Sequence, residues 1–263
     1  MVKKMIFWLI AIVLLLLLTT YFFQEKVIFP SQKIDKNYAY NFKQSFEEIN
    51  LKTTDNQIIN GLYFTVDKPK GAVLFFHGNK GNLKRWGKIA SYFCQFHYNV
   101  FVIDYRGYGK STGSFNEAKM YEDAQLSYSF LKQKFPENKL VLYGRSLGTT
   151  FATKVASENN PKQLILESPF YNLSSAVKHQ IKLGLKPILH YNFSTNNFIE
   201  KVNAPVLIFH GLEDRITASE DSEKLLKKTL HFNKKLVKIE EGTHHNLRDF
   251  DVYKSELEYV LLK

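Results

Sequence analysis

Short apolar runs recur from residue 46 onward, and segments with helical spacing of apolar residues separate most of them. The runs that predict strands are Phe46–Thr54, Ile58–Val66, Ala72–Phe76, Val100–Ile103, Leu140–Tyr143, Gln163–Leu166, Val206–Phe209 and Lys235–Ile239. The segments that predict helices are Asn82–Phe96, Ala118–Gln133, the stretch after Ser146, Ser219–Thr229 and Tyr253–Leu262. Because strands and helices alternate, we expect an α/β fold with a mostly parallel central sheet and helices on both faces. The first two strands are expected to form an antiparallel edge hairpin.

A segment without any charged residue, Met5–Phe23, lies near the N-terminus. At about 1.5 Å per residue it reaches roughly 28 Å, close to the hydrocarbon thickness of a bilayer. We therefore predict an N-terminal transmembrane helix within residues 1–23, a connector over 24–45 and one α/β domain over 46–263. An uncleaved signal anchor fits better than a cleaved signal peptide or a buried helix, because no good cleavage site follows the apolar run. The short basic leader favours a domain outside the cytoplasm.

Polar residues follow the predicted strands of the parallel sheet, where functional groups of such sheets gather. These residues are His77, Asp104, Ser146, Glu167, the pair Glu213-Asp214 and the pair His244-His245. Ser146 stands at the tip of a strand-turn-helix pattern, Gly144-Arg145-Ser146-Leu147-Gly148. A serine in such a turn exposes its Oγ, and the two glycines let neighbouring backbone approach. Ser146 is therefore the predicted nucleophile.

A serine nucleophile needs a histidine base and a carboxylate that orients the histidine. Ser146, Asp214 and His245 follow one another in the chain order serine, acid, histidine, and each lies just past a different predicted strand. We assign these three as catalytic residues, with Glu213 as the alternative acid and His244 as the alternative base. His77 and His210 are expected to fix loops by hydrogen bonding.

Two backbone N–H groups are predicted to bind the oxyanion that forms during acyl transfer. Leu147 supplies one, because it directly follows the nucleophile at the start of a helix. Asn79 supplies the other, from the loop His77-Gly78-Asn79-Lys80-Gly81-Asn82.

Composition and residue spacing argue against several other classes of function. The chain has 263 residues, 44% hydrophobic residues and a formal net charge of +11, but its lysines are scattered and do not suggest nucleic-acid binding. The eight histidines are dispersed, so we expect no metal site and no cofactor. The segment Tyr105–Gly113 lacks the upstream glycine of a phosphate-binding loop. The single cysteine, Cys94, is expected to be a small buried residue.

Together these motifs make the chain resemble the α/β-hydrolase superfamily, and within it the membrane-anchored Bem46-like serine hydrolases. The resemblance rests on YFFQEKVIFP, HGNKGN, DYRGYGKSTG, YGRSLG, ESPF, PVLIFHGLED and GTHHN. The family usually ends in Gly-x-Gly-His-Asn, which aligns His245 with its catalytic histidine, while His244 replaces a glycine. The resemblance implies hydrolysis of esters or thioesters, with acylated proteins among the substrates of relatives.

Residues 170–201 are rich in apolar and aromatic side chains, which suits either a small cap over an acyl or lipid pocket or a surface helix packed on the sheet. The residues that suggest the cap are Ile181, Leu183, Leu185, Ile188, Leu189, Tyr191 and Phe193. The leading hypothesis is a membrane-anchored serine hydrolase of esters or thioesters. A serine peptidase of the same fold and a non-catalytic membrane-anchored binding protein are the alternatives.

Overall fold

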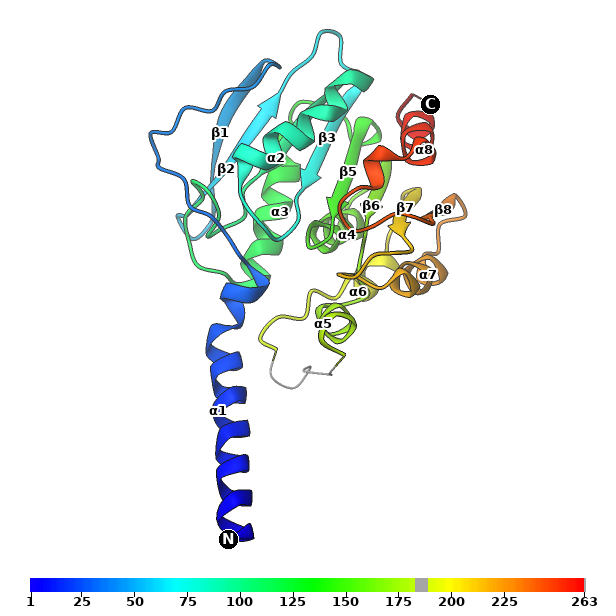
Figure 1. Ribbon diagram of the computed structural model, residues 1–263. Helices are drawn as coiled ribbons and strands as arrows, with labels where there is room; N and C mark the ends of the chain where they lie inside the picture. Colours follow the sequence, from blue (N-terminus) through cyan, green and yellow to red (C-terminus); the bar gives the residue numbers. More distant parts are fainter. Residues whose placement is uncertain (183–188, 263) are drawn as a thin grey trace.

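One eight-stranded sheet forms the centre of the molecule, in the order β1-β2-β4-β3-β5-β6-β7-β8 (Figure 1). The structure is a computed structural model that describes residues 1–182 and 189–262. The strands are β1 (Phe46–Lys52), β2 (Ile58–Phe64), β3 (Gly71–Phe76), β4 (Tyr98–Ile103), β5 (Leu140–Arg145), β6 (Gln163–Glu167), β7 (Val206–Gly211) and β8 (Lys234–Ile239). The pairs β1–β2 and β2–β4 are antiparallel and all other pairs are parallel, which confirms the predicted sheet and hairpin.

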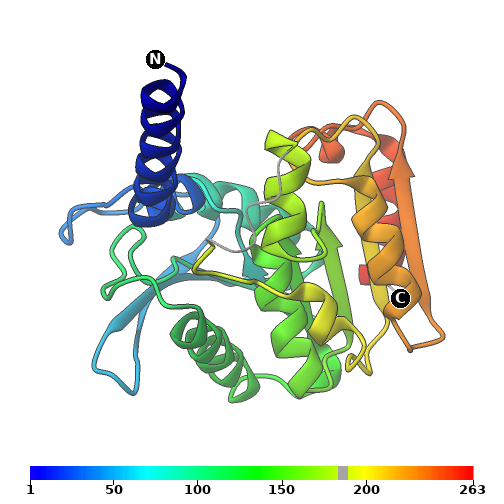
Figure 2. The same ribbon diagram turned by 90° about the horizontal axis from the view of Figure 1, so that it is seen from below.

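Helices cover both faces of this sheet, as Figure 2 shows from below. Apolar side chains of α3 (Glu117–Lys132), α4 (Gly148–Glu158), α6 (Thr195–Ile199) and α7 (Ser219–Lys228) pack in the core on one face. Those of α2 (Leu83–Ala90), the 3-10 helix η1 (Ser91–Phe96) and α8 (Asp251–Leu262) pack in the core on the other. Helix α5 (Leu173–Ile181) lies between β6 and α6, and η2 (Glu137–Lys139) and η4 (Leu247–Asp249) are single 3-10 turns.

The strands of the parallel part read as unbroken apolar runs because both of their faces are covered. In β3, Leu74 and Phe76 enter the core that α3 and α4 cover, while Val73 and Phe75 enter the opposite core. All six residues of β3 are buried. This alternation fixes the register of the strand, since a slip by one residue would exchange the two sets.

Between β6 and β7 the chain departs from the sheet and carries α5 and α6. Of the apolar residues that suggest a cap, Tyr191 and Phe193 are buried in the core beside α4, whereas Ile181 is exposed. Leu183, Leu185 and Ile188 lie outside the described residues. His179 and Gln180, at the end of α5, donate hydrogen bonds to the carbonyls of Asp214 and Ile216 in the loop after β7.

Helix α1 (Val2–Ile28) extends away from the domain, with the N-terminus at its free end (Figure 1). It continues beyond Phe23, where the sequence analysis begins the connector, because no helix-breaking residue precedes Pro30. Phe29, the residue before that proline, leaves the helical region at φ −119° and ψ 72°. Among the described residues, no helix has the combination of length and apolar character that crossing a membrane requires.

A buried ion pair ties the loop after β4 to α3. Arg106 donates from Nε and Nη2 to the two carboxylate oxygens of Asp123, at 2.7 and 2.8 Å, and from Nη1 to Asp55 at 3.0 Å. Both Arg106 and Asp123 are almost fully buried. Removal of one partner would leave the other charge buried and unpaired.

We predict that Asp123→Ala lowers the free energy of unfolding by about 3–5 kcal/mol, because Arg106 keeps its charge in the buried site. The neighbouring exposed pair of Lys119 and Glu122 supplies the control, since Glu122→Ala should cost only about 0–1 kcal/mol. Urea denaturation of the full chain in detergent micelles measures both. Equal losses in the two variants would contradict the prediction.

Candidate active site

Ser146 stands at a strained turn between β5 and α4. Its φ is 51°, in the left-handed region that non-glycine residues rarely occupy. Two hydrogen bonds hold it there: its N–H donates to the carbonyl of Glu167 at 2.9 Å, and its own carbonyl accepts from the N–H of Thr149 at 2.9 Å. Strain of this kind costs about 1–3 kcal/mol and persists where the surroundings enforce it.

The two glycines of the turn are required by close packing. A Cβ on Gly148 would lie 2.0 Å from the carbonyl oxygen of Phe76 in β3, and one on Gly144 would lie 2.5 Å from the carbonyl oxygen of Gly148. The start of α4 can therefore rest on the ends of β3 and β5 only when both positions lack side chains.

The acid and the histidine meet across the loops after β7 and β8. Asp214 accepts a hydrogen bond from His244 Nδ1 through its Oδ2, at 2.7 Å, and from Thr217 through both oxygens. Burial alone would raise the pKa of Asp214, but hydrogen bonds from His210 and His244 outweigh it and hold this pKa well below its ordinary value. Asp214 is thus a buried, ionised carboxylate that orients a histidine, whereas Glu213 is exposed.

The histidine that hydrogen-bonds to Asp214 is His244, the alternative base of the sequence analysis, in place of His245, which the sequence favoured. The turn explains the exchange: Thr243 donates from N and Oγ1 to Asn246 Oδ1, and the guanidinium of Arg145 donates to the carbonyl of His244 at 2.8 Å. His244 is buried and His245 is exposed, and their rings stand at 88° to each other.

The loop after β3 carries Asn79, whose side chain donates to the carbonyl of Ile28 at 3.0 Å. His77 Nδ1 donates to the carbonyl of Gly78 at 2.6 Å, and the hydroxyl of Tyr108 donates to the carbonyl of Asn79 at 2.6 Å. Because the carbonyl and the following N–H of a trans peptide point in opposite directions, the bond at Gly78 fixes the direction of the Asn79 N–H. Within the described residues, neither this N–H nor that of Leu147 has a hydrogen-bond acceptor.

Arg145, which directly precedes Ser146, connects the turn of that serine to the loop of His244, a role that the sequence analysis did not assign. Its Nε lies 2.9 Å from Glu167 Oε1, and the same guanidinium holds the carbonyl of His244. Burial alone would raise the pKa of Glu167, but the charges of Arg145 and Arg248 outweigh it and lower this pKa. The sequence did contain one indication of this role, because Arg145 and Glu167 carry opposite charges at the ends of two adjacent apolar strands.

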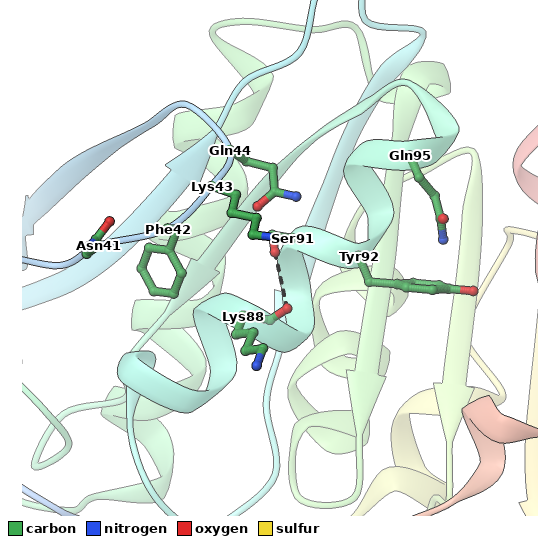
Figure 3. A pocket seen from close by; sticks show the side chains of 8 residues that line it. All are labelled: Asn41, Phe42, Lys43, Gln44, Lys88, Ser91, Tyr92 and Gln95. Carbon is green, nitrogen blue, oxygen red and sulfur yellow. Dashed lines mark hydrogen bonds between the residues drawn. The ribbon is translucent and has the colours of Figure 1, made fainter.

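Ser146, His244 and His245 line one cavity of about 260 Å³, together with Gly78 and Asn79. A wider hollow of about 620 Å³ lies elsewhere, between the connector and α2 with η1 (Figure 3). Among the described residues, its only hydroxyl groups belong to Ser91 and Tyr92, and the Ser91 hydroxyl donates a hydrogen bond to the carbonyl of Lys88. No histidine or carboxylate of the described residues lines that hollow, so the smaller cavity is the candidate active site.

Comparison with known proteins agrees with this fold. Residues 67–195 match the family model Hydrolase_4, described as serine aminopeptidase. A Pyrococcus furiosus esterase has the same fold, with a TM-score of 0.71 over 88% of this chain and 97% of the esterase, at 19% identity. An uncharacterized protein of Acanthamoeba polyphaga mimivirus is 30% identical over 77% of this chain and 76% of its own length.

The chain therefore belongs to the α/β-hydrolases. Its place within them is the Bem46-like group. Protein bem46 of Schizosaccharomyces pombe is 32% identical to it over 66% of this chain and 62% of the yeast protein.

We predict that Gly148→Ala destabilises the protein by about 3 kcal/mol or more, at the upper end of what overpacking costs, because its Cβ would collide with the backbone of β3. Ser157→Ala near the end of the same helix is the control, since Ser157 is only partly buried and bonds only within α4. Thermal unfolding of both variants tests this, and an unchanged melting temperature in Gly148→Ala would contradict it.

Proposed function

We propose that this protein is a serine hydrolase that cleaves carboxylic esters or thioesters through an acyl-enzyme on Ser146. The observation that carries the proposal is the buried Asp214–His244 hydrogen bond beside a serine held at a left-handed turn in the same cavity. This arrangement supports a catalytic triad of Ser146, His244 and Asp214.

In the first half-reaction, Ser146 Oγ attacks the acyl carbon while His244 Nε2 takes the hydroxyl proton. Asp214 accepts a hydrogen bond from the Nδ1–H of His244, which keeps the proton on Nδ1, leaves Nε2 as the base and stabilises the imidazolium that forms. The N–H groups of Leu147 and Asn79 donate to the oxyanion of the tetrahedral intermediate. His244 then returns the proton to the departing alcohol or thiol.

In the second half-reaction, water replaces the leaving group. His244 takes a proton from the water as it attacks the acyl carbon, and the second tetrahedral intermediate uses the same two N–H donors. Collapse releases the carboxylic acid and returns the proton to Ser146.

We expect Ser146→Ala and His244→Ala to lower kcat for a short-chain p-nitrophenyl ester by a factor on the order of 10⁴ to 10⁶, since triad residues act as a unit. His245→Ala should change it by less than about tenfold, or 1.4 kcal/mol in barrier height. A fluorophosphonate probe should label the wild type and His245→Ala, but not Ser146→Ala.

The paired histidine variants decide between the two sequence positions. Loss of activity in His245→Ala with retention in His244→Ala would overturn the assignment of His244 and restore the one made from the family motif. Absence of labelling in folded wild-type protein would overturn the hydrolase proposal itself and favour a non-catalytic binding protein.

A serine aminopeptidase is the second candidate, because the matching family model carries that description. The cavity disfavours this activity, because no acidic side chain of residues 1–182 and 189–262 lines it, whereas Lys80, Arg85 and Arg145 do. An aminopeptidase substrate brings a positively charged amino terminus, which these cations repel. Aminoacyl anilides assayed beside the esters separate the two activities.

We further propose that α1 attaches the protein to a membrane as a single-pass anchor, with the catalytic domain outside the cytoplasm. The support is a set of apolar side chains along α1 that no part of the domain covers. They include Phe7, Trp8, Leu9, Ile12, Leu18 and Phe22. Burying such side chains in lipid is favourable by about 1.5–3 kcal/mol each.

The full chain should therefore stay in the membrane pellet after extraction at alkaline pH, while a variant with Leu9, Ile12 and Leu18 changed to Ser should be released. Release of the wild type by alkali would contradict an integral anchor. External protease added to intact cells should digest the domain if the proposed orientation holds.

A further inference from the structure

Positive charge gathers at the mouth of the active-site cavity. Lys80, Arg85 and Arg145 line the same cavity as Ser146, and no carboxylate lines it among the described residues. Lys80 belongs to the loop that carries Asn79, and Arg85 lies in α2 directly after that loop. Lys80 and Arg85 thus lie within or just after the loop whose Asn79 N–H is a proposed oxyanion donor.

Trp86 holds the two guanidinium groups close together. The Arg85 guanidinium carbon lies 5.0 Å from the centroid of the Trp86 ring, and that of Arg145 lies 5.5 Å from it. Trp86 also donates from Nε1 to the carbonyl of Lys80 at 2.8 Å. A Cβ built on Gly78 would lie 3.3 Å from the Trp86 ring and 3.7 Å from Ser146 Cβ, so the tryptophan stands beside the nucleophile.

The charges of this group are not balanced. Arg145 is neutralised by Glu167, but neither Arg85 nor Lys80 has a carboxylate within ion-pair distance in the described part of the chain. Partial desolvation and the nearby charge of Arg145 lower the pKa of Arg85. The pKa of His245 is also lowered, by partial desolvation and then by His244, Arg145 and Arg85. Two cations held near a third charge without a counterion mark a place where an anion would be stabilised.

We propose that Arg85 and Lys80 form an anion-binding subsite and that the substrate is an acyl ester or thioester bearing a carboxylate or phosphate group. This inference rests on the proposed hydrolase function and names its substrate class. Arg85 is the principal residue, because its planar guanidinium can bind an oxyanion through two N–H groups and the stack on Trp86 limits its motion. Arg145 remains a positioning residue, since its Nε faces Glu167 and its Nη2 donates to the carbonyl of His244.

Two matched ester pairs test the subsite on either side of the scissile bond. The first pair, mono-4-nitrophenyl glutarate and its neutral methyl ester, carries the charge on the acyl side. The second pair, 4-acetoxybenzoate and its methyl ester, carries the charge on the leaving group. The anionic member of at least one pair should have a kcat/KM about tenfold higher after correction for spontaneous hydrolysis, as one charge-assisted hydrogen bond provides. Added NaCl should reduce that preference.

Arg85→Gln in the full chain should abolish the preference by raising KM for the anionic ester far more than for the neutral ester, and Arg85→Lys should keep part of the preference. Lys88→Gln is the matched control, because Lys88 is an exposed cation of the same helix that lines the other hollow (Figure 3). It removes the same charge from α2 without touching the cavity, so it should keep the full preference.

A binding measurement keeps the inference independent of turnover. In Ser146→Ala, butyl phosphate should perturb the fluorescence of Trp86 at lower concentration than butanol does, and Arg85→Gln should remove that difference. Equal kcat/KM within both ester pairs, together with equal binding of butyl phosphate and butanol, would overturn the anion subsite. The proposed hydrolase function would stand in that case, because it is measured by turnover of the neutral esters. Absence of any ester hydrolysis would overturn the proposed function and leave the binding result to decide the subsite.

Discussion

The close approach of α4 to the ends of β3 and β5 is the constraint on which the site depends. It is possible only because Gly144 and Gly148 lack side chains, and it forces Ser146 into a left-handed conformation. The surrounding sheet offsets the energetic cost of that conformation, since the Ser146 N–H donates to the carbonyl of Glu167 in β6. The same approach places the N-terminal end of α4 beside the loop after β3, with the N–H of Leu147 bonded to no acceptor in the part of the chain that the structure describes.

A buried ion pair between Glu167 and Arg145 connects the serine turn to the loop that carries His244. Glu167, fully buried at the end of β6, takes Arg145 as its partner, and Arg145 reaches the carbonyl of His244 in the loop after β8. The backbone of the histidine loop is thus held by the residue that directly precedes the nucleophile. A loss of Glu167 would leave Arg145 uncompensated and would disturb the serine and the histidine together, although Glu167 touches neither side chain.

The sheet, its hairpin and the strand-end positions of the polar residues followed from periodicity, because apolar runs and helical spacing are local properties of the chain. The choice between His244 and His245 did not follow. The two histidines are adjacent and identical in chemistry, so the local sequence does not say which ring turns toward Asp214. Which one does so depends on the hydrogen bond from Thr243 to Asn246 and on Arg145, which lies more than ninety residues away in sequence. The contact of Trp86 with Arg85 and Arg145 could not be predicted from the sequence either, since the three residues come together only in the folded chain.

The end of α1 belongs to the active site as much as to the N-terminal helix. Ile28 accepts from the side chain of Asn79, the N–H of Gly81 donates to the carbonyl of Pro30, and Pro30 lines the cavity. Figure 1 shows α1 leaving the domain on the side toward which β3 and β5 point. A bilayer that held α1 would face the mouth of the cavity and the cations around it. An acyl chain in such a bilayer, joined to an anionic group at its surface, has the charge distribution that the proposed anion subsite requires.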